Sequence, residues 1–166
     1  MPTRIIVNFP FEISGKTFDQ LSEQETGFFI EDQDFVLPKN HALQIILLDK
    51  ESFKRVNSIA RSRLWDTSKH DFRSFPHKQK ILLYDKWDSN SGIQEVRQWL
   101  YGLNIPFKQN IFLWYSDQII LTTWKILVRY WDAFAWSVGV EMFAFDSSMN
   151  WVCEFHHEDV ITYCSN

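Results

Sequence analysis

The chain has 166 residues, a formal net charge of −4 and 17% aromatic residues, and we expect residues 1–166 to form a single globular domain. Aromatic rings suit both cores and interfaces, so composition alone does not divide them between the two. The acidic balance argues against a general nucleic-acid binder, and no apolar run approaches the roughly 18 residues that span a bilayer.

In the N-terminal half, hydrophobic patterning predicts strands and one long helix. The helix begins at Asp49, a favourable N-cap residue, and continues with an apolar stripe at helical spacing. The polar segment 16–25 is predicted to contain a short helix capped near Ser14 or Thr17. The other predicted elements are strands over 4–9, 42–48 and 80–84, short apolar pieces over 27–30 and 34–37, and a loop over 66–79.

In the C-terminal half, Ser91 is the predicted N-cap of a helix over 92–101, with Gly102 following its end. A further helix follows Thr122 or Thr123. The predicted strands of this half are 110–115, 140–145, 151–157 and 160–163. Together these elements indicate an α+β fold, with a mixed or antiparallel sheet packed by two to three helices in a single layer.

Tryptophans mark the last predicted helix. Trp124 and Trp131 lie seven residues apart on its apolar stripe, so we expect both to be buried in the core. Trp136 lies beyond the predicted helix end and is more open to a surface role.

The tail contains the residues that invite a chemical interpretation. If Glu158 and Asp159 form a two-residue turn, Cys153 and Cys164 face each other, although reduced thiols are favoured in the cytosol. His156 and His157 are adjacent on a predicted strand, so their side chains should point to opposite faces and not chelate one ion.

We therefore expect no metal, no cofactor and no catalytic residues. Cys153 and His157 lie four strand residues apart, about 13 Å, which is beyond hydrogen-bond reach. The sequence contains no GxSxG, P-loop or GxGxxG motif. The N-terminal segment has one basic residue and a short apolar run broken by Asn8 and Pro10, unlike a signal peptide, so we expect a cytoplasmic protein.

Charge is uneven along the chain. Residues 1–48 have a net charge of −4, residues 49–86 of +5, and residues 87–166 of −5. Opposed electrostatic patches are one outcome of this pattern, and an intermixed, solvated surface is the other. Basic and aromatic residues alternate in 61–80, which suits single-stranded nucleic acid, but the acidic total favours an ordinary connection.

The C-terminal half resembles a family of small bacterial proteins. The resemblance rests on Trp87-Asp88, the strand, turn and tryptophan of 111–124, and Trp131 followed by Asp132 and Phe134. The closing WVCEFHHED is similar to the ends of immunity proteins of bacterial toxin and contact-dependent inhibition systems. The resemblance covers residues 82–159 and supplies no catalytic residues.

The resemblance implies an immunity protein that binds and neutralises a cognate toxin domain, with a nuclease as one candidate, and that needs no enzymatic activity. An acidic surface would complement a basic toxin. The expected partner-binding residues are Glu23, Glu25, Glu31, Asp32, Asp34, Glu154, Glu158 and Asp159. The alternative is a small enzyme or ligand-binding protein with an aromatic pocket, in which His156 or His157 is the base.

Overall fold

The computed structural model describes residues 3–5, 9–26, 36–69, 71–135 and 141–166. The strands are β1 (Thr3–Ile5), β2 (Ile13–Thr17), β3 (Ile46–Leu48), β4 (Trp65–Asp66), β5 (Asp71–Phe72), β6 (His77–Leu82), β7 (Asn110–Trp114), β8 (Ile119–Thr123), β9 (Met142–Phe145), β10 (Trp151–His156) and β11 (Val160–Ser165). The helices are η1 (Phe18–Gln20), α1 (Glu23–Thr26), α2 (Lys39–Ala42), α3 (Lys50–Leu64), α4 (Asn90–Gly102) and α5 (Trp124–Ala135).

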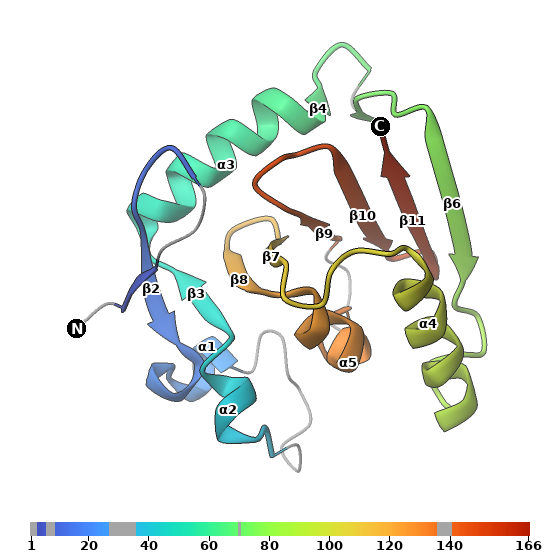
Figure 1. Cartoon of the computed structure of the whole chain (residues 1–166), viewed down its shortest axis with the longest axis horizontal. Coiled ribbons are helices and arrows are strands. Elements are labelled where there is room, and N and C mark those ends of the chain that lie inside the picture. The colour runs from blue at the N-terminus through green and yellow to red at the C-terminus, as the bar shows by residue number, and fades with distance from the viewer. Residues whose placement is uncertain (1–2, 6–8, 27–35, 70, 136–140) are drawn as a thin grey trace.

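Within the described residues, nine strands form one sheet in the order β1-β2-β3-β8-β7-β9-β10-β11-β6 (Figure 1). Every neighbouring pair is antiparallel. β4 and β5 form a separate hairpin. The predicted α+β class with an antiparallel sheet is confirmed.

Helix α3 begins at its predicted N-cap. The Asp49 side chain accepts a hydrogen bond from the Ser52 backbone N–H at 2.8 Å, which satisfies one of the amides that a helix start leaves free. Val56 and Leu64 are fully buried and belong to the same apolar cluster as Phe112 of β7. Local capping and the apolar stripe therefore place α3 on one face of the sheet.

Helices α4 and α5 also begin at hydroxyl side chains. Ser89 Oγ accepts from the Gly92 N–H at 3.1 Å, so α4 begins two residues before the position that Ser91 predicted. Thr123 Oγ1 accepts from the Ile126 N–H at 3.4 Å, which confirms one of the two caps predicted for α5.

The end of α4 differs from the prediction. Gly102 is the last helical residue, and Asn104 adopts the left-handed conformation with a φ of 59°. Asn tolerates this region because its short polar side chain can form local hydrogen bonds. The chain thus leaves α4 two residues later than a terminating glycine at position 102 would require.

The predicted burial of Trp124 and Trp131 is confirmed, because both have 0% exposure.

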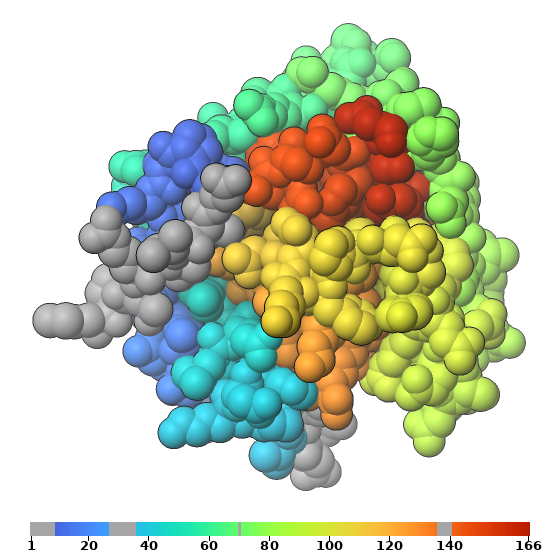
Figure 2. Space-filling model, in the orientation of Figure 1, coloured from blue at the N-terminus to red at the C-terminus, as the bar shows by residue number. Residues whose placement is uncertain are grey.

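The connection between α4 and β7 closes over the start of α5, where the Trp124 N–H donates to Gln109 O at 2.9 Å and the Lys125 N–H to Phe107 O at 3.0 Å. Figure 2 shows this connection, in yellow, between the β9–β11 strands and α5.

The two faces of β7 pack against different helices. Ile111 and Leu113 belong to the cluster that contains α4 and α5, whereas Phe112 and Trp114 belong to the cluster that contains α3. Successive strand residues point to opposite faces, so helices cover both faces of the sheet. The sequence had predicted one layer of helices. The second layer forms because apolar residues of β7 face both sides of the sheet and each side is covered by a helix.

At the N-terminal side, the segment predicted as a short helix begins as strand β2. A Cβ at Gly15 would lie 2.2 Å from Leu47 O of the neighbouring strand β3, so the two backbones approach closely only because this residue is glycine. Helix η1 then begins at Thr17, one of the two predicted caps, whose N–H donates to Gln20 Oε1 at 3.2 Å.

Two further predictions concern connecting segments. The region 66–79, predicted as a loop, contains the β4–β5 hairpin and the start of β6 at His77. The predicted pieces 27–30 and 34–37, and the surface role of Trp136, fall wholly or mainly outside the described residues.

The β10–β11 hairpin has a three-residue turn, not the two-residue turn considered from the sequence. His156 pairs with Val160, and Asp159 in the turn has a φ of 57°. A residue in the left-handed region is typical of three-residue hairpin connections. The register is therefore shifted by one residue from the sequence-based expectation.

This shift separates the two cysteines. Cys153 pairs with Tyr163, and Cys164 pairs with Val152. Because a shift of one residue moves a side chain to the other face, Cys153 and Cys164 point in opposite directions and both are free thiols. The facing-cysteine arrangement is wrong for this structure.

Candidate functional site

The N-terminal acidic residues lie in and after α1. Glu23 is exposed. Glu25 instead accepts a hydrogen bond from the Ser22 backbone N–H at 2.9 Å and forms an ion pair with Lys16 at 2.9 Å. The Ser22 amide and then Lys16 lower the Glu25 pKa to about 2. Glu31, Asp32 and Asp34 lie outside the described residues.

Glu154 does not lie on an open surface. It lines a cleft of about 200 Å³ between the central part of β10 and the β4–β5 hairpin, together with Arg73 and Lys78. Burial raises the pKa of its carboxyl group. A partly desolvated carboxylate in a cleft is a poorer first contact for a large partner than an exposed one.

The two acidic residues of the β10–β11 turn have different environments. The Glu158 side chain is 76% exposed. Asp159 Oδ1 accepts a hydrogen bond from Trp87 Nε1 at 2.9 Å, and Asp159 O accepts one from the Leu83 N–H at 2.8 Å. Asp159 therefore holds the β6–α4 connection against the turn, whereas the Glu158 side chain is exposed to solvent beside His156.

Among the described residues, the structure does not bring Glu23 and Glu25 of α1 next to the predicted acidic residues of the tail. Lys16, the partner of Glu25, lies on β2, which is five places from β10 in the sheet. At the usual strand spacing this separation is about 24 Å. The acidic residues of α1 and of the turn therefore form distinct surfaces.

The β6–α4 connection adds acidic residues that sequence reasoning missed. We define the acidic turn surface as the exposed residues Asp85, Asp88, Glu95 and Glu158. Tyr84 precedes Asp85 in the chain and is 74% exposed. Lys86 is paired with Glu95 at 2.6 Å, so these two charges offset each other and the net negative charge of the surface comes from Asp85, Asp88 and Glu158. Asp85 belongs to residues 49–86, which have a net positive charge, so the charge pattern of the sequence did not indicate that Asp85 lies near the β10–β11 turn.

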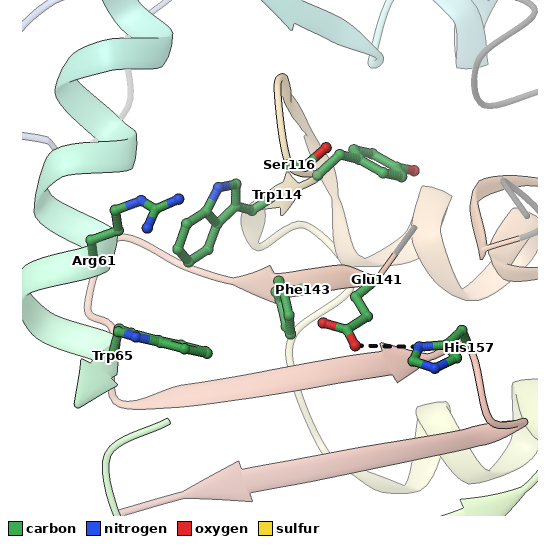
Figure 3. Close-up of a pocket in the computed structure, with 8 residues that line it drawn as sticks. Arg61, Trp65, Trp114, Ser116, Glu141, Phe143 and His157 are labelled. Atoms are coloured by element: carbon green, nitrogen blue, oxygen red, sulfur yellow. Dashed lines mark ion pairs between the residues drawn. The ribbon is translucent and has the colours of Figure 1, made fainter. Parts of the chain in front are cut away.

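A second candidate site is an aromatic pocket of about 440 Å³ (Figure 3). Its lining residues come from α3, β4, β7, the β7–β8 turn, the start of β9 and the β10–β11 turn: Arg61, Trp65, Trp114, Tyr115, Ser116, Glu141, Phe143 and His157. The Arg61 guanidinium lies 5.6 Å from the Trp114 ring centroid, within cation–π range. This volume and lining suit a small organic ligand.

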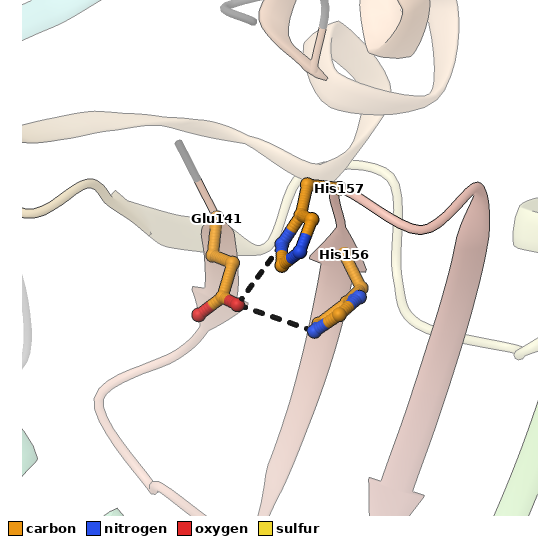
Figure 4. A group of neighbouring side chains, drawn as sticks. All are labelled: Glu141, His156 and His157. Carbon is orange, nitrogen blue, oxygen red and sulfur yellow. Dashed lines mark ion pairs between the residues drawn. The ribbon is translucent and has the colours of Figure 1, made fainter. Parts of the chain in front are cut away.

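At the edge of this pocket, Glu141, His156 and His157 converge (Figure 4). Glu141 Oε1 lies 3.2 Å from His156 Nε2 and 3.3 Å from His157 Nδ1. The two imidazole rings stack with centroids 4.2 Å apart. The argument that adjacent histidines point to opposite faces is wrong here, because β10 ends at His156 and His157 already belongs to the turn.

The arrangement allows acid–base chemistry as well as binding. His157 lines the pocket and contacts the Glu141 carboxylate, which can orient an imidazole as a general base. The buried Cys153 has no such role, since burial raises the pKa of its thiol far above the usual value and disfavours the thiolate.

Comparison with known proteins identifies no relative: no family model, no curated protein and no solved structure matches the chain. Among the helices that the structure describes, none combines the length and apolarity needed to cross a bilayer.

Proposed function

We propose that this protein is an immunity protein that binds and neutralises a cognate bacterial toxin domain in the cytoplasm. The supporting observation is the acidic turn surface, which consists of the exposed residues Asp85, Asp88, Glu95 and Glu158, with the exposed Tyr84 next to Asp85 in the chain. The sequence resemblance of residues 82–159 to immunity proteins includes the same part of the chain.

Charge and the tyrosine would act at different stages of binding. Long-range attraction between an acidic surface and a basic partner accelerates encounter. Tyrosine side chains then supply much of the binding free energy when they become buried at an interface. A nucleic-acid-cleaving domain is a suitable partner class, because proteins that bind nucleic acid present basic surfaces.

The direct test uses the product of the gene immediately upstream. Expressing that product alone should stop bacterial growth, and co-expressing this protein should restore it. A double variant, Asp85→Lys with Glu158→Lys, should fold normally and fail to restore growth. The proposal is rejected if the upstream product is harmless, or if the double variant protects as well as the unmodified chain.

A second candidate function is supported by the aromatic pocket. Trp65, Trp114 and Phe143 provide flat apolar walls, and Arg61 provides a cation, so a planar ligand with an anionic group matches the lining. Under this hypothesis the protein is a ligand-binding protein or small enzyme with His157 as the base. Screening aromatic carboxylates by tryptophan fluorescence tests it, because a ligand in the pocket should alter emission in the unmodified chain and not in Trp114→Phe.

A further inference from the structure

The convergence of Glu141, His156 and His157 goes beyond both candidate functions. One possible ligand atom from each residue lies within 4.8 Å of the others. We propose that these three side chains form a binding site for a divalent first-row transition-metal ion, with Zn²⁺ as the representative ion.

The backbone places two of the ligands opposite each other. Phe155 pairs with Met142 across β10 and β9, and continuing this antiparallel register by one residue sets Glu141, just before β9, opposite His156. Met142 is buried, which fixes the start of β9 against the core. His156 is thus the last residue of β10, Glu141 directly precedes β9, and His157 joins them from the first position of the turn.

The distances match a tetrahedral centre along two of the three edges that join the protein ligand atoms. Zn²⁺ binds histidine nitrogen and carboxylate oxygen at about 2.0–2.2 Å, which places neighbouring tetrahedral ligands roughly 3.3–3.6 Å apart. Glu141 Oε1 lies 3.2 Å from His156 Nε2 and 3.3 Å from His157 Nδ1. The remaining nitrogen–nitrogen edge can close by rotation of the half-exposed His157 ring.

The donor set selects the class of ion. Two imidazole nitrogens and one carboxylate oxygen suit Zn²⁺, Ni²⁺ or Cu²⁺. Ca²⁺ and Mg²⁺ prefer ligand sets made of oxygen alone. Three protein ligands leave at least one position for water or a ligand, and Glu141 and His157 place that position at the edge of the aromatic pocket.

The turn also supplies a second group that would respond to the ion. The Glu158 N–H donates to His156 Nδ1 at 3.2 Å, so the neutral imidazole holds its proton on Nε2. With an ion on Nε2 the neutral ring carries its proton on Nδ1, so the Glu158 N–H must give up its hydrogen bond to Nδ1, and the Glu158 carboxylate, 3.9 Å from Nδ1, is the nearby acceptor. Glu158 would thus orient His156 once the ion is bound.

The test is a titration of the untagged, chelator-treated protein with ZnCl₂ in competition with a chromophoric chelator. We expect one Zn²⁺ per chain. Glu141→Gln and His157→Asn should each weaken binding by at least about tenfold, since even residues that only orient metal ligands contribute 10–100-fold. Glu158→Gln should cause a smaller loss.

His77→Asn is the matched control, because His77 is an exposed histidine on β6 outside the cluster. It should leave the affinity unchanged. Co²⁺ provides a measurement that needs no variant, since a tetrahedral site produces intense visible absorption bands. Absence of stoichiometric Zn²⁺ binding, an equal loss in His77→Asn, or a Co²⁺ spectrum identical to that of the aqueous ion would each overturn the proposal.

Discussion

Trp87 Nε1 donates a hydrogen bond to Asp159 Oδ1 across 2.9 Å and thereby joins the β6–α4 connection to the β10–β11 turn. Asp159 has a φ of 57°, a region that Asp and Asn adopt more readily than other residues with a Cβ. Trp87 also packs on Trp131, with ring centroids 4.8 Å apart. The contact therefore connects the acidic turn surface to the core.

Replacing Asp159 separates its structural role from its charge. Asp159→Asn keeps both an acceptor oxygen and a tolerance of the left-handed region, so its free energy of unfolding should stay close to that of the unmodified chain. Asp159→Ala loses both and leaves the Trp87 N–H without this acceptor, which should cost about 2 kcal/mol. Urea unfolding measures both variants, and equal stability of the two would show that the contact contributes nothing.

The tryptophan stripe of α5 is expected to dominate stability. Trp131→Ala removes a fully buried indole and should lower the free energy of unfolding by about 3–5 kcal/mol. Tyr101→Ala, at a 63% exposed aromatic residue on α4, is the control and should cost about 0.5 kcal/mol. Thermal or urea denaturation that gives the same stability for both variants would contradict the assignment of this stripe to the core.

Local signals predicted the three long helices α3, α4 and α5, but not α2 (Lys39–Ala42), whose last residue lies in the strand expected over 42–48. Asp49 and Thr123 are caps with an apolar stripe immediately after them, and these signals need no information from distant residues. Strand β2 lacks such a signal, because Gly15 and Lys16 interrupt its apolar pattern and only the close approach of β3 explains the glycine. The second helical layer similarly depends on which face of β7 each helix covers.

The candidate sites depended even more on tertiary structure. The length of the turn determines the register of the β10–β11 hairpin. A turn of three residues instead of two changes the face on which Cys164 lies and places His157 in the turn and not in the strand. Glu141 lies fifteen residues before His156, and no spacing rule connects them. In the acidic turn surface, Glu158 was identified from the sequence. Asp85 could be assigned to this surface only from the contact between the β6–α4 connection and the β10–β11 turn.

The separation of the two cysteines predicts distinct reactivity. Cys164 is half-buried and Cys153 is fully buried, and burial raises the pKa of both thiols, to the greater degree at Cys153. A thiol reagent should label Cys164 first, and label Cys153 only on unfolding. Mass spectrometry after mild oxidation should show no intramolecular disulfide, and detection of a Cys153–Cys164 bridge in folded protein would contradict the register.

Glu154 is expected to make stability depend on pH. Burial raises its pKa above the ordinary value of 4.5, so the folded protein binds this proton more tightly than the unfolded chain. The resulting stabilisation is present below pH 4.5 and is lost as pH rises through the raised pKa. Glu154→Gln cannot ionise, so it should be more stable than the unmodified chain at neutral pH, with a smaller difference in acid. A thermal denaturation series in which the variant loses stability equally at every pH would contradict this environment.

The central claim is recognition through the acidic turn surface, and its most direct test is the association rate with the product of the upstream gene. Asp85→Lys with Glu158→Lys should slow association strongly at low salt, slow it less at high salt, and change dissociation little. The matched control reverses two exposed basic residues of α3, Lys54→Glu with Arg63→Glu, and should not slow association. An unchanged rate for the acidic-surface variant, together with slow association of the α3 variant, would contradict the account and identify α3 as the recognition surface.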